Sequence, residues 1–501
     1  MEKKLDILLI IPSGRAKVYQ KLGNDLSAIE PPVWATLLAT FLLNRGCSVE
    51  ILDAESEYLS HDEAAMRIAE IKPLLAVFMI YGQQPSASTQ SMPAGRELCQ
   101  LVDESGLGVK TVCLGTHPSA LPERTLREEP YDFVCEGEGP VTVYELFQVL
   151  KEGTEEYGKV PGLWYRQGGE VGVGPKAELI QDLDCELGGQ KWELLDMSRY
   201  RAHNWHCFDN VSDRKPYASI QTSLGCPYKC SFCCINAPFG GPGIRFWSPQ
   251  LIVDQIDVLV EKYSIRNIKI PDEMFVLNEQ HVIGICDLLI DRNYDLNIWA
   301  YGRIDTVKDR FLEKLKKAGF NWLGIGIESG SKYVRNGVSK GKFGDADIVA
   351  VIEKIRGHGI SVGANYIFGL PDDTMESMTN TLDLAVYLNT EWANFYCAMA
   401  YPGSPLYHMA KEKKIPLPGD DGGPGWIGYS QHSYDTLPLA TEHLSATEVI
   451  DFRDQAFNKY FKNNDYLKML GGKFGSQAVD HINEMTSIDI QRKHRSASEV
   501  T

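Results

Sequence analysis

The 501-residue sequence lacks long apolar runs and lacks an excess of positive charge. Its apolar stretches, such as Leu74 to Tyr81, are far shorter than the roughly 18 residues that a membrane-spanning helix needs. Fifty Lys and Arg against 67 Asp and Glu give a formal net charge of −17, which opposes binding to nucleic-acid phosphates and anionic membranes. Met1 to Lys4 leads into a strand-like run and does not have the pattern of a signal peptide. We therefore expect a cytoplasmic protein without a transmembrane segment and without a nucleic-acid partner.

Cysteine is scarce as well, with 12 residues in the chain, which is too few for a disulfide-stabilised scaffold. Eight of them are scattered, mostly among apolar neighbours, and are typical of small buried side chains. The other four, Cys226, Cys230, Cys233 and Cys234, fall within nine positions. This cluster stands out because the 44% hydrophobic and 23% charged residues are otherwise those of an average globular protein.

The length predicts about three domains at roughly 150 residues each. In the first of them, residues 1–153, short apolar runs alternate with amphipathic helical segments. The expected strands are Leu5 to Pro12, Ser48 to Asp53, Leu74 to Tyr81, Lys110 to Gly115 and Asp132 to Glu136. Regular alternation of strand and helix is typical of a doubly wound, Rossmann-like α/β sheet, in which ligands bind at the carboxyl ends of the strands.

Residues 154–215 break this rhythm and are expected to form a connector that contains a hairpin near Gln167. A second alternating array occupies residues 216–410. Its expected strands are Ala218 to Ser223, Asn267 to Pro271, Leu296 to Arg303, Trp322 to Ile327, Ser361 to Phe368 and Asn394 to Ala400. Six strand and helix units suit a partial (β/α)6 barrel, with its chemistry at the carboxyl ends of the strands. Residues 411–501 are expected to form a helical region with a helix near Ala446 to Phe461 and a frayed tail from Ser496 to Thr501.

Three of the clustered cysteines, Cys226, Cys230 and Cys233, lie in a loop directly after an expected strand. Their gaps of three and two residues allow the loop to wrap a metal centre. Structural zinc normally needs four ligands, and no second Cys or His pair follows at the usual spacing. Three thiolates on a four-iron cluster instead leave one iron open to another ligand. Cys234 is adjacent to Cys233 and is expected to point elsewhere.

The loop Cys226-x3-Cys230-x2-Cys233, with Phe232 before the third cysteine, resembles the cluster loop of the radical S-adenosylmethionine (SAM) superfamily. Further matching segments fall at later strand ends in the expected order. They are Pro271 to Phe275, Trp299 to Asp305, Gly324 to Gly330 and Phe368 to Pro371. In the first domain, Leu114 to Glu123 and Cys135 to Gly139 resemble the cobalamin-binding domain that precedes the barrel in one subgroup of this superfamily.

The resemblance implies that the three cysteines hold a 4Fe-4S cluster and that the residues after the other strands bind SAM. The implied SAM contacts are Phe232 and the Phe368 to Pro371 turn with Leu370 for adenine, Asp272 or Glu273 for the amino group, Arg303 for the carboxylate and Glu328 for the ribose or another polar part. Each residue also has a structural alternative. Asp272 and Glu273 could cap a helix, Arg303 could pair with Asp305, and Glu328 could belong to a turn.

Cobalamin binding is implied less directly. Many cobalamin proteins carry a cobalt-ligating histidine in the loop after the first strand, but here that loop reads Pro12-Ser13-Gly14-Arg15-Ala16-Lys17. A protein ligand of that type is therefore absent. We assign His117 to the pocket and not to cobalt, with a loop-stabilising role as its alternative. The glycines Gly82, Gly115 and Gly139 are expected to permit close approach of a large planar ligand.

The function that the resemblance implies is cobalamin-dependent methylation of an unactivated carbon. Such an enzyme cleaves SAM to a radical that abstracts hydrogen from its substrate, and a second SAM supplies the methyl group. The partners expected are a small-molecule or lipid-like substrate and a low-potential donor such as flavodoxin or ferredoxin, under anaerobic conditions. One alternative is a non-methylating oxidoreductase or cyclase resembling the anaerobic Mg-protoporphyrin ester cyclase. Another, outside this class, is a corrinoid-binding or iron-sulfur sensor without catalysis.

Overall fold

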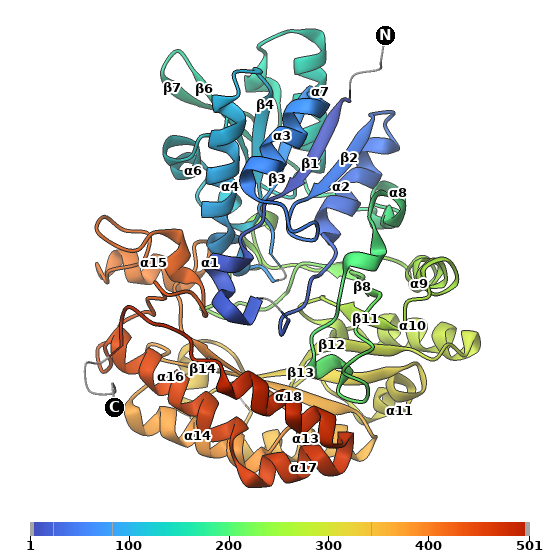
Figure 1. Ribbon diagram of the computed structural model, residues 1–501, viewed down its shortest axis with the longest axis vertical. Coiled ribbons are helices and arrows are strands. Elements are labelled where there is room, and N and C mark those ends of the chain that lie inside the picture. The colour runs from blue at the N-terminus through green and yellow to red at the C-terminus, as the bar shows by residue number, and fades with distance from the viewer. Residues whose placement is uncertain (1–4, 24, 83, 342, 496–501) are drawn as a thin grey trace.

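The computed structural model describes residues 5–23, 25–82, 84–341 and 343–495, and of residues 345 and 346 only the backbone. The expected tail from Ser496 to Thr501 and the first four residues lie outside the described part. Two α/β units stack along the long axis of the molecule, and C-terminal helices cover one side of the second unit (Figure 1). None of the described helices is both long and apolar enough to cross a membrane.

The N-terminal unit is built on a seven-stranded sheet in the order β2-β1-β3-β4-β5-β6-β7. Its strands are β1 Ile7–Ile11, β2 Val49–Asp53, β3 Leu75–Met79, β4 Lys110–Leu114, β5 Phe133–Cys135, β6 Leu163–Gln167 and β7 Glu170–Val173. The first five pair in parallel and confirm the doubly wound sheet. The hairpin of β6 and β7, expected in the connector, pairs antiparallel with β5 and extends this sheet.

Helices on both faces of this sheet bury its strands, and β3 at its centre is buried at all five positions. The helices are α1 Arg15–Tyr19, α2 Val33–Leu43, α3 His61–Ile71, α4 Ala87–Glu104, α5 Thr116–Ala120, α6 Pro122–Glu128 and α7 Pro140–Glu152. Nine of the eleven residues of α2 are buried, because this helix packs against the sheet on one side and the connector on the other. The Thr40 hydroxyl donates to the Gly189 carbonyl at 2.6 Å across that second contact.

The second unit is a six-stranded, all-parallel sheet in the order β15-β14-β13-β12-β11-β8, which is the predicted partial barrel. Its strands are β8 Tyr217–Ser219, β11 Asn267–Ile270, β12 Asn297–Arg303, β13 Phe320–Glu328, β14 Ser361–Phe368 and β15 Trp392–Cys397. Its helices are α9 Pro249–Tyr263, α10 Glu279–Arg292, α11 Asp309–Lys317, α12 Lys332–Gly337, α13 Asp345–Gly357 and α14 Met375–Leu388. Helix α9 begins with the Ser248 side chain as N-cap and Pro249 at the first position, a pair of residues typical of a helix start.

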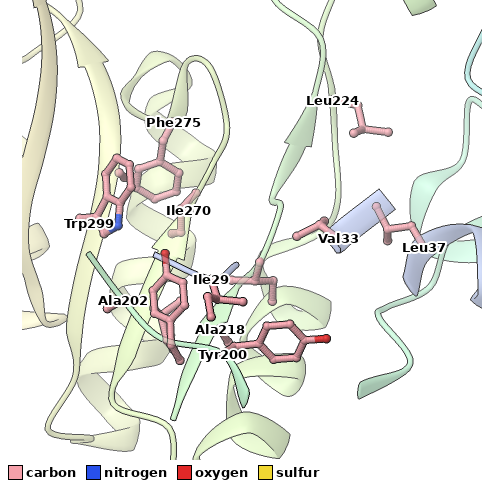
Figure 2. Packing of buried hydrophobic residues seen from close by; sticks show 14 of the residues in the cluster. Ile29, Val33, Leu37, Tyr200, Ala202, Ala218, Leu224, Ile270, Phe275 and Trp299 are labelled. Carbon is pink, nitrogen blue, oxygen red and sulfur yellow. The ribbon is translucent and has the colours of Figure 1, made fainter. Parts of the chain in front are cut away.

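The two units share one hydrophobic core. Ile29 of the N-terminal unit forms an antiparallel bridge to Arg201 of the connector, with both backbone bonds at 3.0 Å. Figure 2 shows buried side chains from all three parts in the same cluster: Ile29, Val33 and Leu37 from the first, Tyr200 and Ala202 from the connector, and Ala218, Ile270, Phe275 and Trp299 from the barrel. The connector is therefore a packed element and not a loose linker.

The C-terminal region closes the side of the barrel that strand pairing leaves open. It contains α15 Pro405–Glu412, α16 Ala446–Phe461, α17 Asn464–Phe474 and α18 Ser476–Ser487, with a 3-10 turn at Trp426–Tyr429. Helix α16 has the bounds that the sequence predicts and starts with a capping box between Ser445 and Glu448. Beyond α18 the chain returns to the N-terminal unit, where the Gln20 side-chain amide donates to the Gln491 carbonyl at 3.1 Å.

Candidate functional site

A cavity of about 1440 Å³, part of it open to solvent, lies where the strand ends of the two units face each other. The first unit lines it with residues that follow β1, β2 and β3 and with the start of α2; the barrel lines it with residues that follow β8 and β11. Aromatic rings form part of the wall, with Trp34 stacked on Tyr81 at 4.8 Å and Phe239 beside it at 6.3 Å. Among the described lining residues there is neither histidine nor cysteine. The lining residues show that the cavity lies between the carboxyl ends of the strands of the two units, where the sequence predicts that ligands bind.

The cysteine loop begins at the rim of this cavity, between the short strands β9 Ser223–Leu224 and β10 Arg245–Phe246. Gly225 lines the cavity and has φ +89°, and a Cβ there would come within 2.5 Å of the Gly243 carbonyl. The neck of the loop is thus closed so tightly that only glycine fits. Cys226 is buried, while Cys230 and Cys233 are half-buried, and all three thiols are free.

The three thiols lie in one short loop. In the described part of the chain, no three His, Cys, Asp or Glu side chains are arranged to hold one metal ion. This arrangement does not suit a mononuclear zinc site, whose ligands surround one ion at about 2.0–2.3 Å. An iron-sulfur cluster instead takes one thiolate on each of several irons. The donor set of three free thiols on a short loop fits such a cluster.

Of the two predicted carboxylates after β11, only Glu273 lines the cavity. Asp272 is buried and accepts hydrogen bonds from Thr222 N at 2.7 Å, Thr222 Oγ1 at 2.6 Å and Ser223 Oγ at 2.6 Å. These bonds tie β11 to the strand that leads into the cysteine loop. Burial raises the pKa of Glu273 to about 7, and Lys269 opposes this shift. Glu273 is thus a carboxyl group at the cavity wall. Burial disfavours its charged form and a neighbouring cation stabilises that form, so the position favours a cationic ligand.

Arg303, at the end of β12, lies against the cysteine loop. Its guanidinium packs 3.9 Å from the centre of the Tyr228 ring, and Nη1 approaches Cys230 Sγ at 3.5 Å. It also pairs with Asp305 through Nε at 2.9 Å and Nη2 at 3.0 Å, and it donates to the Lys340 carbonyl. The pairing with Asp305 is the structural alternative considered for this residue. Arg303 therefore holds the cysteine loop in place and also contacts Cys230, one of the three predicted cluster ligands.

Glu328, at the end of β13, forms a buried ion pair with Lys340 at 2.6 Å, with 8% and 9% of the side chains exposed. Burial opposes the charge on Lys340, but the Glu328 carboxylate and Cys230 together outweigh it, so the pKa of Lys340 is raised. A Cβ on Gly326 would come within 2.5 Å of the Glu328 carboxylate, so the glycine leaves the space for this pair. Glu328 itself has φ +67°, an uncommon conformation for its residue type. The sequence reasoning missed Lys340, and its only trace in the pattern is the glycine two residues before Glu328.

Phe232 and Leu370 pack in the same small cluster with Val334, Val338 and Ala398, which connects the cysteine loop to the turn after β14. Phe368 lies in the core, stacked on Phe395 at 5.7 Å. The backbone N–H groups of Gly369 and Leu370 donate to the Asp373 carboxylate at 3.1 and 3.0 Å. These two donors are therefore engaged within the turn, an interaction that the sequence reasoning missed.

The residues assigned to cobalamin occupy different surroundings. Gly82 lines the cavity, and a Cβ on it would come within 2.2 Å of the Ala87 Cβ. A Cβ on Gly115 would come within 2.1 Å of the Ile80 carbonyl and one on Gly139 within 2.7 Å of the Leu114 side chain. Gly115 and Gly139 are thus required by packing within the first unit. The buried His117 ring meets Trp426 at 4.4 Å, and its Nδ1 lies 3.3 Å from Thr89 Oγ1. Burial lowers the pKa of His117 to about 3, so this imidazole is neutral.

Asp53, at the end of β2, also lines the cavity, and burial raises its pKa to about 6. Because this folded-state value exceeds the unfolded value, the stability linked to this group is present at low pH and is lost as pH rises from about 4 through 6. Asp53→Asn should therefore remove about 2–3 kcal/mol of pH dependence. Relative to the variant, the wild type gains stability as pH falls from 7.5 to 4.5, measured by urea unfolding. Asp62→Asn, at an exposed position of α3, should leave the profile unchanged.

Two protein-family models match the chain in the places where the two units lie. Residues 220–385 match the radical SAM superfamily, and residues 20–147 match the B12-binding domain. These matches place a B12-binding domain ahead of a radical SAM domain in the chain, and they confirm the predicted resemblance and fold.

Known relatives agree with this arrangement. The chain is 29% identical over 409 residues to an uncharacterized methyltransferase from Pyrococcus horikoshii, covering 81% of this chain and 83% of the relative. It is 24% identical over 458 residues to the anaerobic magnesium-protoporphyrin IX monomethyl ester cyclase of Rubrivivax gelatinosus, covering 90% and 77%. The structure of the radical S-adenosylmethionine methyltransferase TsrM from Kitasatospora setae, with cobalamin and a [4Fe-4S] cluster bound, superposes with a TM-score of 0.69. It has 17% identity and covers 97% of this chain and 100% of TsrM.

Proposed function

We propose that the protein is a cobalamin-dependent radical SAM methyltransferase that acts on an unactivated carbon of a small molecule. The observation that carries this proposal is the shared cavity. Residues at the strand ends of the B12-binding domain and of the radical SAM barrel line the same space, so ligands of the two domains would meet in it. Transfer of a group between two cofactors and a substrate needs such contact.

In this proposal Cys226, Cys230 and Cys233 hold the 4Fe-4S cluster. Once bound, the cluster with SAM supplies the radical that removes substrate hydrogen, and cobalamin supplies the methyl group. Glu273 is the carboxylate available to the cationic amino group of SAM, because Asp272 is engaged with Thr222 and Ser223. Asp272 then acts on the site by fixing the start of the cysteine loop.

The polar groups of the barrel are proposed to bind the remainder of SAM. Arg303 and the Glu328–Lys340 pair lie beside the cysteine loop and offer charged groups to the carboxylate and the ribose of SAM. Phe232, Phe368 and Leu370 form the apolar side near the adenine. On the other side of the cavity, Gly82 and the Trp34–Tyr81 stack offer a flat surface to the corrin. Gly115, His117 and Gly139 support that wall from behind, and no lining histidine is offered to cobalt in the described residues.

The proposal extends to the surroundings of the enzyme. We expect a low-potential protein such as flavodoxin or ferredoxin as the electron donor. We expect the cytoplasm as the compartment, because all twelve cysteines are free thiols. For the domain organisation we retain residues 1–153, 154–215, 216–410 and 411–501, with the β6–β7 hairpin contributing to the first sheet.

A second candidate function is a cyclase without methyl transfer, favoured by the 24% identity to the magnesium-protoporphyrin ester cyclase over 90% of this chain. The two candidates differ in their products. With SAM, reductant and a substrate, the methyltransferase yields S-adenosylhomocysteine together with 5′-deoxyadenosine, whereas the cyclase yields no S-adenosylhomocysteine. Failure to form 5′-deoxyadenosine in the reduced, reconstituted protein would exclude both and leave a corrinoid-binding or iron-sulfur sensor.

Two cysteine variants, one at Cys230 and one at Cys234, test the proposed cluster ligands. Cys230→Ala should prevent assembly of the cluster during anaerobic reconstitution, because it removes one of three iron ligands. Cys234→Ala is the matched control: its thiol is buried beside the loop and is not one of the three ligands, so iron content and 5′-deoxyadenosine formation should stay close to wild type. Iron and sulfide analysis with the visible absorption spectrum measures the outcome. Equal loss of the cluster in both variants would contradict the assignment.

A further inference from the structure

The lumen of the barrel forms a second cavity of about 1550 Å³, part of it open to solvent, that adjoins the first. Tyr19, Gln84, Ala87 and Gln90 line both cavities. Residues of β11 to β15 form part of the lumen wall. The rest comes from the connector, from α16 and α18, and from residues of the N-terminal unit such as Tyr19, Leu22 and Leu26. A substrate in this lumen would thus lie next to the chamber proposed for the cofactors.

Several inward-facing side chains of the barrel strands are only half-buried. Tyr301, Asn365 and Asn394, which line the lumen, are half-buried, whereas Ile298 and Ala300 on the outer face of β12 are fully buried under helices. A small barrel is normally filled by its own inward side chains. The space between these side chains, part of it open to solvent, is available to another molecule.

Aromatic rings dominate one part of the lumen wall. Trp205 of the connector meets Trp299 edge-on at 5.0 Å and stacks with Trp392 at 6.1 Å, and all three line the cavity. Tyr301 and Tyr396 extend the same surface. Flat, rigid rings of this kind suit a flat ligand, which can stack on a face or meet an edge.

Neutral hydrogen-bond donors project from the neighbouring strands. Asn394 Nδ2 donates to Asn365 Oδ1 at 2.9 Å, and Asn394 Oδ1 accepts from Trp392 Nε1 at 2.9 Å. Each amide nitrogen carries two hydrogens, so this ladder leaves donor capacity on both asparagines. Trp299 Nε1 is buried and makes no hydrogen bond of good geometry among the described residues, although it lies close enough to the Tyr217 hydroxyl to interact with it. A ligand that satisfies these groups must present acceptor atoms.

The charged groups of the lumen are already neutralised. Lys269 pairs with Glu30 at 2.8 Å, and Arg453 donates to the Phe395 carbonyl at 2.8 Å and pairs with Asp454 at 2.8 Å. An anionic ligand would find no uncommitted cation in these pairs. An alkyl chain would cover the asparagine and indole donors without pairing them, which is unfavourable for buried polar groups.

We propose that the lumen is the substrate chamber and that its substrate is a compact, planar, uncharged aromatic or heteroaromatic molecule with carbonyl or ring-nitrogen acceptors. This inference rests on the proposed function and narrows its substrate class, which the sequence left as small or lipid-like. The aromatic wall packs against the ring of the substrate, and Asn365, Asn394 and Trp299 donate hydrogen bonds to its acceptor atoms.

Binding of a probe tests this inference without turnover, so its failure is distinguishable from failure of the proposed function. Quinoline-2-carboxamide, with a ring nitrogen and a carbonyl, is titrated into the full-length reconstituted protein and followed by saturation-transfer NMR and calorimetry. Trp299→Phe removes the indole N–H together with the five-membered ring and should raise Kd about tenfold. Asn394→Leu should do the same, while Asn458→Ala on the exposed face of α16 should not change Kd.

Circular dichroism verifies that the variants are folded, and the conservative Trp299→Phe keeps the test valid if Asn394→Leu does not fold. Sodium myristate is the competing lipid probe. The proposal predicts that myristate does not displace quinoline-2-carboxamide. Displacement by myristate, or binding of the quinoline amide that neither variant weakens, would overturn it.

Discussion

Trp205→Ala is expected to lower the free energy of unfolding by about 3–5 kcal/mol, the range for removing a large buried aromatic side chain. Trp205 is 8% exposed and meets Trp299 at 5.0 Å, Trp322 at 5.2 Å and Trp392 at 6.1 Å between ring centres. It comes from the connector, yet it closes the floor of the barrel between three of its strands. Its loss therefore removes contacts to β12, β13 and β15 together.

Urea unfolding followed by far-UV circular dichroism measures this loss. Trp205→Phe keeps one ring in the same place and should lose only part of the stability. Trp164→Ala is the control, because this half-buried tryptophan lies on the β6–β7 hairpin at the edge of the first sheet. It should lose much less stability than Trp205→Ala. Equal losses at the two positions would show that Trp205 does not join the connector to the barrel.

Lys269→Met is expected to cost a similar 3–5 kcal/mol, because it leaves the buried Glu30 carboxylate without its partner. The two side chains are 3% and 6% exposed and form two contacts of 2.9 and 2.8 Å across the boundary between the units. Burial raises the pKa of Glu30, while Lys269 opposes that shift. Without Lys269 the folded-state pKa of Glu30 rises further above its unfolded value, so the deficit grows as pH rises.

The same unfolding experiment at pH 5 and pH 8 separates this mechanism from a simple packing defect. The deficit of Lys269→Met should be larger at pH 8, and the double variant Lys269→Met with Glu30→Leu should recover much of the lost stability. Lys314→Met is the control, because its pair with Asp287 is exposed to solvent and contributes little. A deficit that is independent of pH and is not relieved in the double variant would contradict the proposed origin.

Much of the fold could be predicted because its strands are short apolar runs separated by helices with clear ends. Ser248 and Pro249 mark the start of α9, and Gly153 in a left-handed conformation ends α7. Helices α1, α5 and α6 were missed because five to seven residues are too few to show helical periodicity. The hairpin was expected, but its pairing with β5 depends on tertiary packing that local patterns do not carry.

The site divides in the same way. Spacing alone singles out Cys226, Cys230 and Cys233, because a ligand loop is local in sequence. Residue spacing does not single out Lys340 or Asp373, because the partner of each is brought to it by the fold. The partner of Lys340 is Glu328, and the partners of Asp373 are two backbone N–H groups. The lumen is still harder to predict from the sequence, because residues of the connector, of α18 and of the N-terminal unit, among them Tyr19 and Leu26, enclose it together with the barrel strands.

The core in which Ile29, Tyr200 and Ala218 pack together bears on how such enzymes can diversify (Figure 2). Two domains joined by a flexible linker can be exchanged as separate modules. Here the B12-binding domain, the connector and the barrel are tied by one apolar cluster and by the Ile29–Arg201 bridge. A chimaera cut at a domain boundary would place mismatched side chains in that cluster. New specificity is therefore more easily acquired through the lumen and the C-terminal helices, which can change while this shared core stays intact.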